Sequence, residues 1–315
     1  MDNLILVATQ VGVLFALMAV GFVCRKVKML TTESVKGIVD ILVVIVTPAI
    51  VIQAFQRPFD AGMLKGLGFT ACAALLGHAV AIVCSYLLIH HPKAHTKNVL
   101  RVSAVFSNAG FMGIPLTQAL LGDVGVFYSV VYVGIFNVVI WSWGLCTVKN
   151  ISTKQLMGPE IKSMFLNPGT VGLALGLPLF FTSTQLPTVL ATPVRFLSDL
   201  NTPLAMLIIG YYLCGAKLGP VLRSAAAYVA SAFRLLAYPL AVIGVLCLLR
   251  DVLSLDRSMM LALVVSSAAP TAALTSMFAA RYGSDVDMSV GMVSGTTLVS
   301  IVTMPPVIAF AMSVL

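Results

Sequence analysis

The sequence predicts an all-α polytopic membrane protein in which ten membrane-spanning helices form two inverted sets of five. Three observations predict this fold. The 315 residues are 59% hydrophobic and only 10% charged, whereas soluble domains carry about 25% charged residues. Apolar segments of membrane-spanning length recur along the chain, and the longest polar connection divides them into two sets of five. We therefore expect the lipid bilayer to surround most of the protein.

Each of the ten segments is long enough to cross a bilayer, which takes about 17–25 residues, or more when the helix is tilted. The first is expected to remain as a helix, because its basic residues Arg25, Lys26 and Lys28 follow the apolar run instead of preceding it as in a signal peptide. The gaps are too short for a separate soluble domain. The expected helices, one to ten, cover residues 4–24, 34–55, 62–89, 98–121, 124–148, 168–185, 194–215, 221–249, 257–280 and 286–312.

The basic residues predict the orientation of these helices, since cytoplasmic loops carry an excess of lysine and arginine. Thirteen of them lie in or near the gaps after helices one, three, five, seven and nine, against five at the opposite gaps. Both termini are then expected outside a plasma membrane, the inner membrane of a bacterium. The formal charge of +8 is mostly a consequence of this topology, so we expect no nucleic-acid partner.

The longest connection, residues 149–167, is expected to be a cytoplasmic linker between a first five-helix repeat, residues 1–148, and a second, residues 168–315. Because five is odd, the second repeat starts from the opposite side of the membrane, as in the inverted repeats of many secondary carriers. Weak internal symmetry supports this interpretation. The matching features are Asp40 followed by Thr47-Pro48 in helix two and Asp199 followed by Thr202-Pro203 in helix seven, and a single ionisable residue inside helix three, His78, and helix eight, Arg234.

Helices four and nine are both interrupted by residues that break helices. Helix four carries two glycines and a proline between Gly110 and Pro115, and helix nine carries Ala269-Pro270-Thr271. Within hydrocarbon, freed backbone groups are tolerated only where they are buried in protein or line a wet cavity. The alternative is that these residues only kink or pack the helices. The pair in equivalent positions favours a binding site and hence a transporter.

Each interruption is expected to create a second half-helix whose N-terminus points at the bilayer centre, one beginning near Pro115 and one after Pro270. Two such N-termini would hold a small anion without any formal charge. Nearby polar groups, Ser107, Ser266, Ser267 and Thr275 among them, suit a carboxylate. The candidate substrate-binding residues are Asn108, Ala109, Gly110, Gly113, Pro115, Ala269, Pro270 and Thr271.

Four ionisable residues are candidates for charge or proton coupling: Arg234, His78, Asp40 and Asp199. Arg234 would attract the anion or neutralise one of the two aspartates, or else extend to the membrane interface. His78 would couple protons, or else be a packed core residue. Asp40 and Asp199 are equally consistent with helix ends near the interface.

No metal or cofactor is expected, because the six cysteines have no metal-ligand or redox spacing. No dense acidic cluster marks a sodium site, so the coupling ion, proton or sodium, stays open. Glycines at positions 172 and 176 of helix six have the spacing typical of close helix packing.

The segment Ser107 to Leu116, SNAGFMGIPL, resembles the fourth-helix signature of the auxin efflux carrier family. Ala269-Pro270-Thr271, with Phe278 to Gly283 and Asp285, resembles the ninth helix and following loop of the same family. The resemblance implies a fold like that of the sodium/bile-acid symporters, with helices four and nine crossing at their breaks. It further implies a mobile transport domain of helices three to five and eight to ten, a scaffold of helices one, two, six and seven, and a homodimer.

The same resemblance places Asn108 on the asparagine that contacts substrate in plant members, and Pro115 and Pro270 on the crossing prolines. The chain lacks the large cytoplasmic loop of the plant members, and Ala109-Gly110 replaces bulkier residues. A bacterial carrier of malonate, malate or a related acid is therefore expected rather than an auxin carrier.

The expected function is secondary transport of a mono- or dicarboxylate by an elevator-type mechanism. The alternative on the same fold is a sodium or proton carrier, which would need acidic residues near the breaks. An intramembrane enzyme would need paired acids, a metal set or a nucleophile with a base, and a sensor would need an output domain. The sequence offers none of these, so we expect no enzymatic activity.

Overall fold

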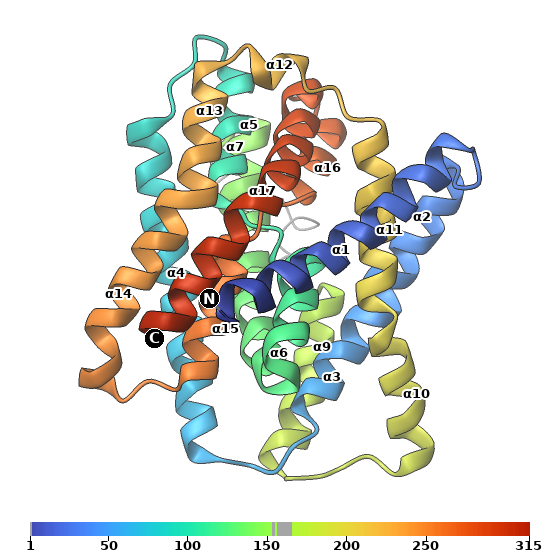
Figure 1. The fold of residues 1–315 in the computed structure, drawn as a ribbon, viewed down its shortest axis with the longest axis vertical. Helices are drawn as coiled ribbons and strands as arrows, with labels where there is room; N and C mark the ends of the chain where they lie inside the picture. The colour runs from blue at the N-terminus through green and yellow to red at the C-terminus, as the bar shows by residue number, and fades with distance from the viewer. Residues whose placement is uncertain (1, 153–154, 156–165) are drawn as a thin grey trace.

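The computed structural model describes residues 2–152, 155 and 166–315, and within these ranges the protein is built from helices (Figure 1). Most of the expected linker, residues 149–167, lies outside the described residues. The helices of the first half are α1 (Asp2–Lys26), α2 (Thr32–Ile41), η1 (Leu42–Val46), α3 (Thr47–Phe55), α4 (Ala61–Leu88), α5 (Ala94–Val105), η2 (Ala109–Gly113), α6 (Ile114–Val139), η3 (Ile140–Gly144) and α7 (Leu145–Lys149).

The second half repeats this pattern of long and interrupted helices. Its elements are α9 (Pro168–Phe181), α10 (Thr188–Asp199), α11 (Asn201–Cys214), α12 (Gly219–Leu222), α13 (Ala225–Ala232), η5 (Phe233–Ala237), α14 (Tyr238–Leu253), α15 (Arg257–Ala268), α16 (Leu274–Arg281) and α17 (Val286–Val314).

Successive connections alternate between the two ends of the molecule. In Figure 1 the connections from α3 to α4, α9 to α10 and α14 to α15 lie at the lower end, and the connection from α4 to α5 lies at the upper end with α12. This alternation is what a chain crossing a bilayer repeatedly requires. Six of the described helical stretches are long and apolar enough to span a bilayer, so the protein is a multi-pass membrane protein.

The six long stretches differ in number from the ten expected spans because several spans are divided or joined. The expected spans 98–121 and 257–280 are each divided into shorter helices by a break. The stretch Ala109–Lys149 contains a reversal at Gly122, whose φ of 63° and ψ of −156° are not helical. Glycine adopts positive φ at little cost, so this residue turns the chain between the fourth and fifth expected helices. The ten-helix arrangement itself stays a prediction.

In three helices, the turn directly before a proline contains one additional residue. The amide N–H groups of Thr47, Ile114 and Tyr238 each donate to the carbonyl five residues earlier, and each of these residues precedes a proline. A proline ring clashes with the carbonyl four residues before it in an α-helix. The wider π-turn relieves that clash, so these prolines continue their helices instead of ending them.

Helices α1 and α11 approach so closely that their backbones touch. A Cβ atom on Gly210 would overlap the main-chain oxygen of Met18, and one on Gly21 would overlap that of Leu207. The close packing predicted for Gly172 and Gly176 is observed against α3. These contacts join helices from the two halves of the chain.

The substitution Gly210→Ala is expected to lower the thermal stability of detergent-purified protein by the equivalent of about 1–3 kcal/mol, because the added methyl meets backbone that has no freedom to move aside. Thermal unfolding followed by intrinsic fluorescence measures the effect. Gly12→Ala on α1 is the matched control, since a Cβ atom there meets open space, and alanine favours the helix by about 1 kcal/mol. Equal melting temperatures for the two variants would contradict the close approach.

Candidate functional site

The two interrupted helices cross by pairing their extended main chains. Helix α5 ends at Val105 and helix α15 at Ala268, and beyond these ends Ser107 and Thr271 form an antiparallel β-bridge. The N–H of Asn108 donates to the carbonyl of Pro270 at 2.6 Å, and the N–H of Ala272 donates to that of Phe106 at 2.9 Å. Each break thus satisfies main-chain groups of the other, which hydrocarbon could not do.

The break in α15 has a local cause, since Pro270 disfavours the helical conformation for the residue before it. Ala269 is extended, with ψ of 148°. The break in the first repeat differs from expectation. We expected the second half-helix to begin near Pro115, but it begins at Ala109 with Asn108 as the N-cap residue. The π-turn accommodates Pro115, so this residue lies within the helix, and the extended residues precede both glycines.

Side chains from neighbouring helices support the crossover. The hydroxyl of Thr271 donates to the carbonyl of Ser103 at 2.9 Å, and the N–H of Thr271 donates to the hydroxyl of Thr296 at 3.0 Å. The hydroxyls of Ser107 and Tyr132 lie 3.4 Å apart. Thr271 is therefore bonded on both its side chain and its main chain, and it is completely buried.

Arg234 is completely buried and bonds to the main chain of both breaks. Its guanidinium donates to the carbonyls of Ala104, at 3.4 Å, and Val105, at 2.9 Å, and also to the carbonyl of Ser267. It does not extend to the membrane interface. Asp40 and Asp199, the acids that we considered as its partners, are exposed.

His78 is buried among aromatic rings beside the first break. Its Nδ1 lies 2.7 Å from the carbonyl of Ala74, one turn earlier on α4, and its ring centroid lies 5.7 Å from that of Phe106 and 5.4 Å from that of Tyr132. Its Nε2 has no hydrogen-bond partner among the described residues. The surroundings suit the packed core residue that was one of the two interpretations of His78.

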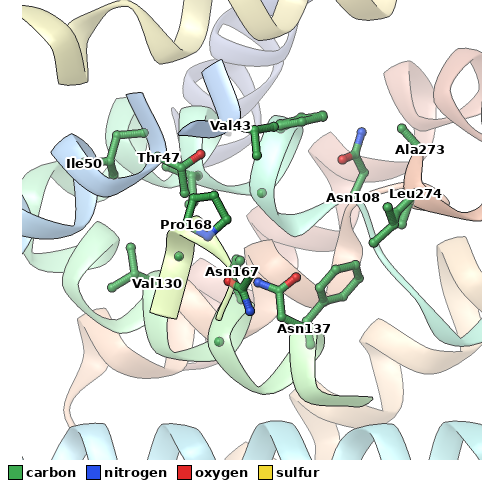
Figure 2. Close-up of a pocket in the computed structure, with 18 of the residues that line it drawn as sticks. Val43, Thr47, Ile50, Asn108, Val130, Asn137, Asn167, Pro168, Ala273 and Leu274 are labelled. Carbon is green, nitrogen blue, oxygen red and sulfur yellow. The ribbon is translucent and has the colours of Figure 1, made fainter. Parts of the chain in front are cut away.

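A cavity of about 280 Å³ lies beside the crossover (Figure 2). The first residues of both second half-helices line it, Asn108 and Gly110 on one and Ala273 and Leu274 on the other. The rest of the wall comes from α2, η1, α3, α6, η3, the start of α9 and the start of α11. The remaining described lining residues are Val39, Val43, Thr47, Ile50, Val51, Ser107, Phe111, Ile114, Val130, Val133, Gly134, Phe136, Asn137, Trp141, Asn167, Pro168, Gly169, Asn201, Ala272 and Met277.

The polar groups of this cavity are amides and hydroxyls. Besides Asn108, they come from Thr47, Asn137, Asn167 and Asn201, and Figure 2 shows Asn137 and Asn167 close together, across the cavity from Asn108. None of the described lining residues is ionisable. Sequence reasoning did not place these four side chains in the site. Two signals could have indicated them: an asparagine within an apolar segment, and a polar residue directly before Pro48 or before Thr202-Pro203.

A second cavity of about 390 Å³ lies next to the first and is far more polar. Two of the predicted site residues, Pro115 and Asp199, line this cavity and not the first. Ile50, Ile114 and Asn201 line both cavities and separate them. The other residues of the second cavity are Gln53, Gln118, Asp123, Arg195, Ser198 and Thr202.

The remaining predicted site residues lie behind the cavity wall. Ala109, Ala269, Pro270 and Thr271 are buried and line neither cavity. A Cβ atom on Gly113 would lie 3.5 Å from the Cα of Ser266, so this glycine packs α15 against the start of α6. The structure therefore brings together Asn108 and Gly110 at the cavity, and gives the others supporting positions.

Comparison with known proteins agrees with these features. A family model described as "Membrane transport protein" matches residues 6–308. The chain belongs to this family. It is the auxin efflux carrier family whose signature the fourth helix resembles, so the protein is a membrane transporter. It is also similar to an uncharacterized transporter of Methanothermobacter thermautotrophicus, at 23% identity over 292 residues, which cover 92% of this chain and 93% of the relative.

Thr271→Val is expected to destabilise the protein by about 1–2 kcal/mol, because it removes the hydroxyl that donates to Ser103 and leaves that carbonyl without this donor. Melting temperatures of purified variants measure the loss. Thr275→Val is the matched control, since the buried Thr275 hydroxyl has no partner among the described residues and its removal is expected to be neutral or stabilising. A loss of stability in Thr275→Val as large as that in Thr271→Val would contradict this assignment of hydrogen bonds.

Proposed function

We propose that the protein is a secondary carrier for a small organic anion, a mono- or dicarboxylate, which binds in the crossover cavity beside Asn108. One observation carries the proposal: the N-termini of both second half-helices line a single cavity whose described lining contains no ionisable side chain. A helix N-terminus carries about half a positive charge and unpaired N–H donors. Two of them suit one carboxylate without any lysine or arginine.

The rest of the wall favours the class of substrate. The cavity is about 280 Å³ in volume and mostly apolar, with the amide of Asn108 next to one N-terminus and those of Asn137 and Asn167 opposite. Such a site accommodates a carboxylate at the crossover with an apolar or amide-bonded remainder of the molecule towards α9. Both an amphipathic monocarboxylate and a short dicarboxylate fit this description.

Transport proceeds in this proposal by an elevator-type movement in ten helices arranged as two inverted repeats. The packing of α1 with α11 and of α3 with α9 and α10 suits the scaffold, and the packing of α6 on α4 and α15 suits the transport domain, while α1 packs on α17 across this division. The two cavities, one on each side of Ile114, supply the alternate openings. The loops with most basic residues face the cytoplasm, and the scaffold forms a homodimer.

A cation carrier on the same fold is the alternative from the sequence. It would need acidic side chains at the crossover, and the described lining of that cavity has none. Asp199 lies in the second cavity, and Asp40 is exposed. The anion carrier is therefore favoured, and the coupling ion is left to experiment.

Asn108→Ala is expected to weaken carboxylate binding at least tenfold, since a hydrogen bond to a charged group contributes about 1.5–3 kcal/mol. A thermal-shift screen of purified protein with mono- and dicarboxylates, with and without sodium, measures binding because a ligand of the folded state raises its melting temperature. Asn98→Ala is the control, as this buried amide bonds to Asn150 and lies away from the cavity. A shift with sodium alone, and none with any carboxylate, would favour the cation carrier instead.

The two cavities are expected to open to opposite sides of the membrane. In a variant without the six native cysteines, Asn137→Cys should react with an impermeant maleimide from the cytoplasmic side, and Gln118→Cys from the outside. Bound carboxylate should protect only Asn137→Cys. Labelling of both from the same side would exclude the proposed orientation of the cavities.

A further inference from the structure

The C-terminal ends of the two first half-helices meet at one buried arginine. The last carbonyls of any helix lack intrahelical partners and need another donor. At the end of α5, Ala104 and Val105 find theirs in the guanidinium of Arg234, and at the end of α15 Ser267 does the same. A single side chain thus joins the two ends that face away from the candidate substrate.

The charges at this point are balanced without an acid. Each helix C-terminus carries about half a negative charge, so two of them match one guanidinium. No carboxylate of the described residues lies within ion-pair distance of Arg234, whose side chain is completely buried. An unpaired buried charge is costly, and the two helix ends therefore act as the counter-charge.

Carbonyls at half-helix C-terminal ends are the groups that bind sodium in carriers with broken helices. We propose that Arg234 is a tethered cation in the position that a mobile coupling ion would occupy, so that the crossover of this protein is complete without sodium. It follows that shortening the side chain creates a site for a free monovalent cation between Val105 and Ser267.

The neighbours of Arg234 hold its side chain in this position. The ring of Tyr238 lies under the guanidinium, with the guanidinium carbon 4.7 Å from the ring centroid. Gly77 on α4 leaves room for the Tyr238 hydroxyl, since a Cβ atom there would lie 2.6 Å from it. Arg234 itself lies in the π-turn η5. Arg234 is a positioning residue for both breaks and does not line the substrate cavity.

The test is a cation series on the full-length protein in detergent. The melting temperature of the unmodified protein should be the same in sodium chloride and choline chloride at equal ionic strength. Arg234→Ala should melt at a lower temperature, and millimolar guanidinium or sodium should restore it in a saturable manner. Arg257→Ala is the matched control, because exposed Arg257 also donates to a helix-end carbonyl, that of Met312 at 2.7 Å, and no cation should rescue it.

A second pair of variants keeps the test decisive if Arg234→Ala does not fold. Arg234→Lys retains a cation and should keep most of the stability without sodium, whereas Arg234→Gln retains a donor but no charge and should be much less stable. Equal stability of the two variants would overturn the proposal, as would stabilisation of the unmodified protein by sodium in particular. A folded Arg234→Ala that no cation restores would also overturn it.

The consequence for transport, that carboxylate movement needs no sodium gradient, rests on the proposed carrier function. The stability measurements do not, because no carboxylate is present in them. If no Asn108-dependent thermal shift is found, the proposed anion site is wrong and the tethered-cation proposal is unaffected. If no cation rescues the variant, the tethered-cation proposal is wrong and the anion site is unaffected.

Discussion

The satisfaction of main-chain hydrogen bonds at the two breaks is the constraint on which this structure depends. In the middle of a bilayer, hydrocarbon offers no hydrogen-bond partner to freed N–H and C=O groups. The chain meets this demand by pairing Asn108 with Pro270 and Phe106 with Ala272, and by directing Arg234 at the carbonyls that remain. Main-chain groups of each break have their partners in the other, so helices from opposite halves of the sequence meet at this point.

The crossover also separates the positive ends of the broken helices from their negative ends. The N-terminal ends of η2 and α16, which are positive, face the mostly apolar cavity beside the crossover. The C-terminal ends of α5 and α15, which are negative, face a fixed guanidinium in the protein interior. Of these four helix ends, the two positive ones therefore border the cavity, and the two negative ones are neutralised inside the protein. In the proposed site, the binding chemistry comes from backbone geometry, and side chains such as Asn108 refine it.

Much of this could be predicted from the sequence, and the rest could not for physical reasons. Pro270 indicated a broken helix, and the apolar segments indicated a multi-pass membrane protein, because the effects of proline and of hydropathy are local. The start of the second half-helix at Ala109 instead of Pro115 depends on pairing with residues about 160 positions away, which no local pattern encodes. The partners of Arg234 are main-chain carbonyls, which are the same for every residue type. The amides of Asn137, Asn167 and Asn201 become site residues only once three separate helices converge.

The thin partition formed by Ile50, Ile114 and Asn201 has an electrical consequence. Where water or solutes fill both cavities, the transmembrane voltage falls over this partition and not over the full thickness of the bilayer. In the proposed carrier, an anion that passes from one cavity to the other then crosses most of the field in a short movement. The associated work is about 2.3 kcal/mol per charge for every 100 mV, so a monoanion and a dianion would respond to membrane potential in a ratio set by their charge.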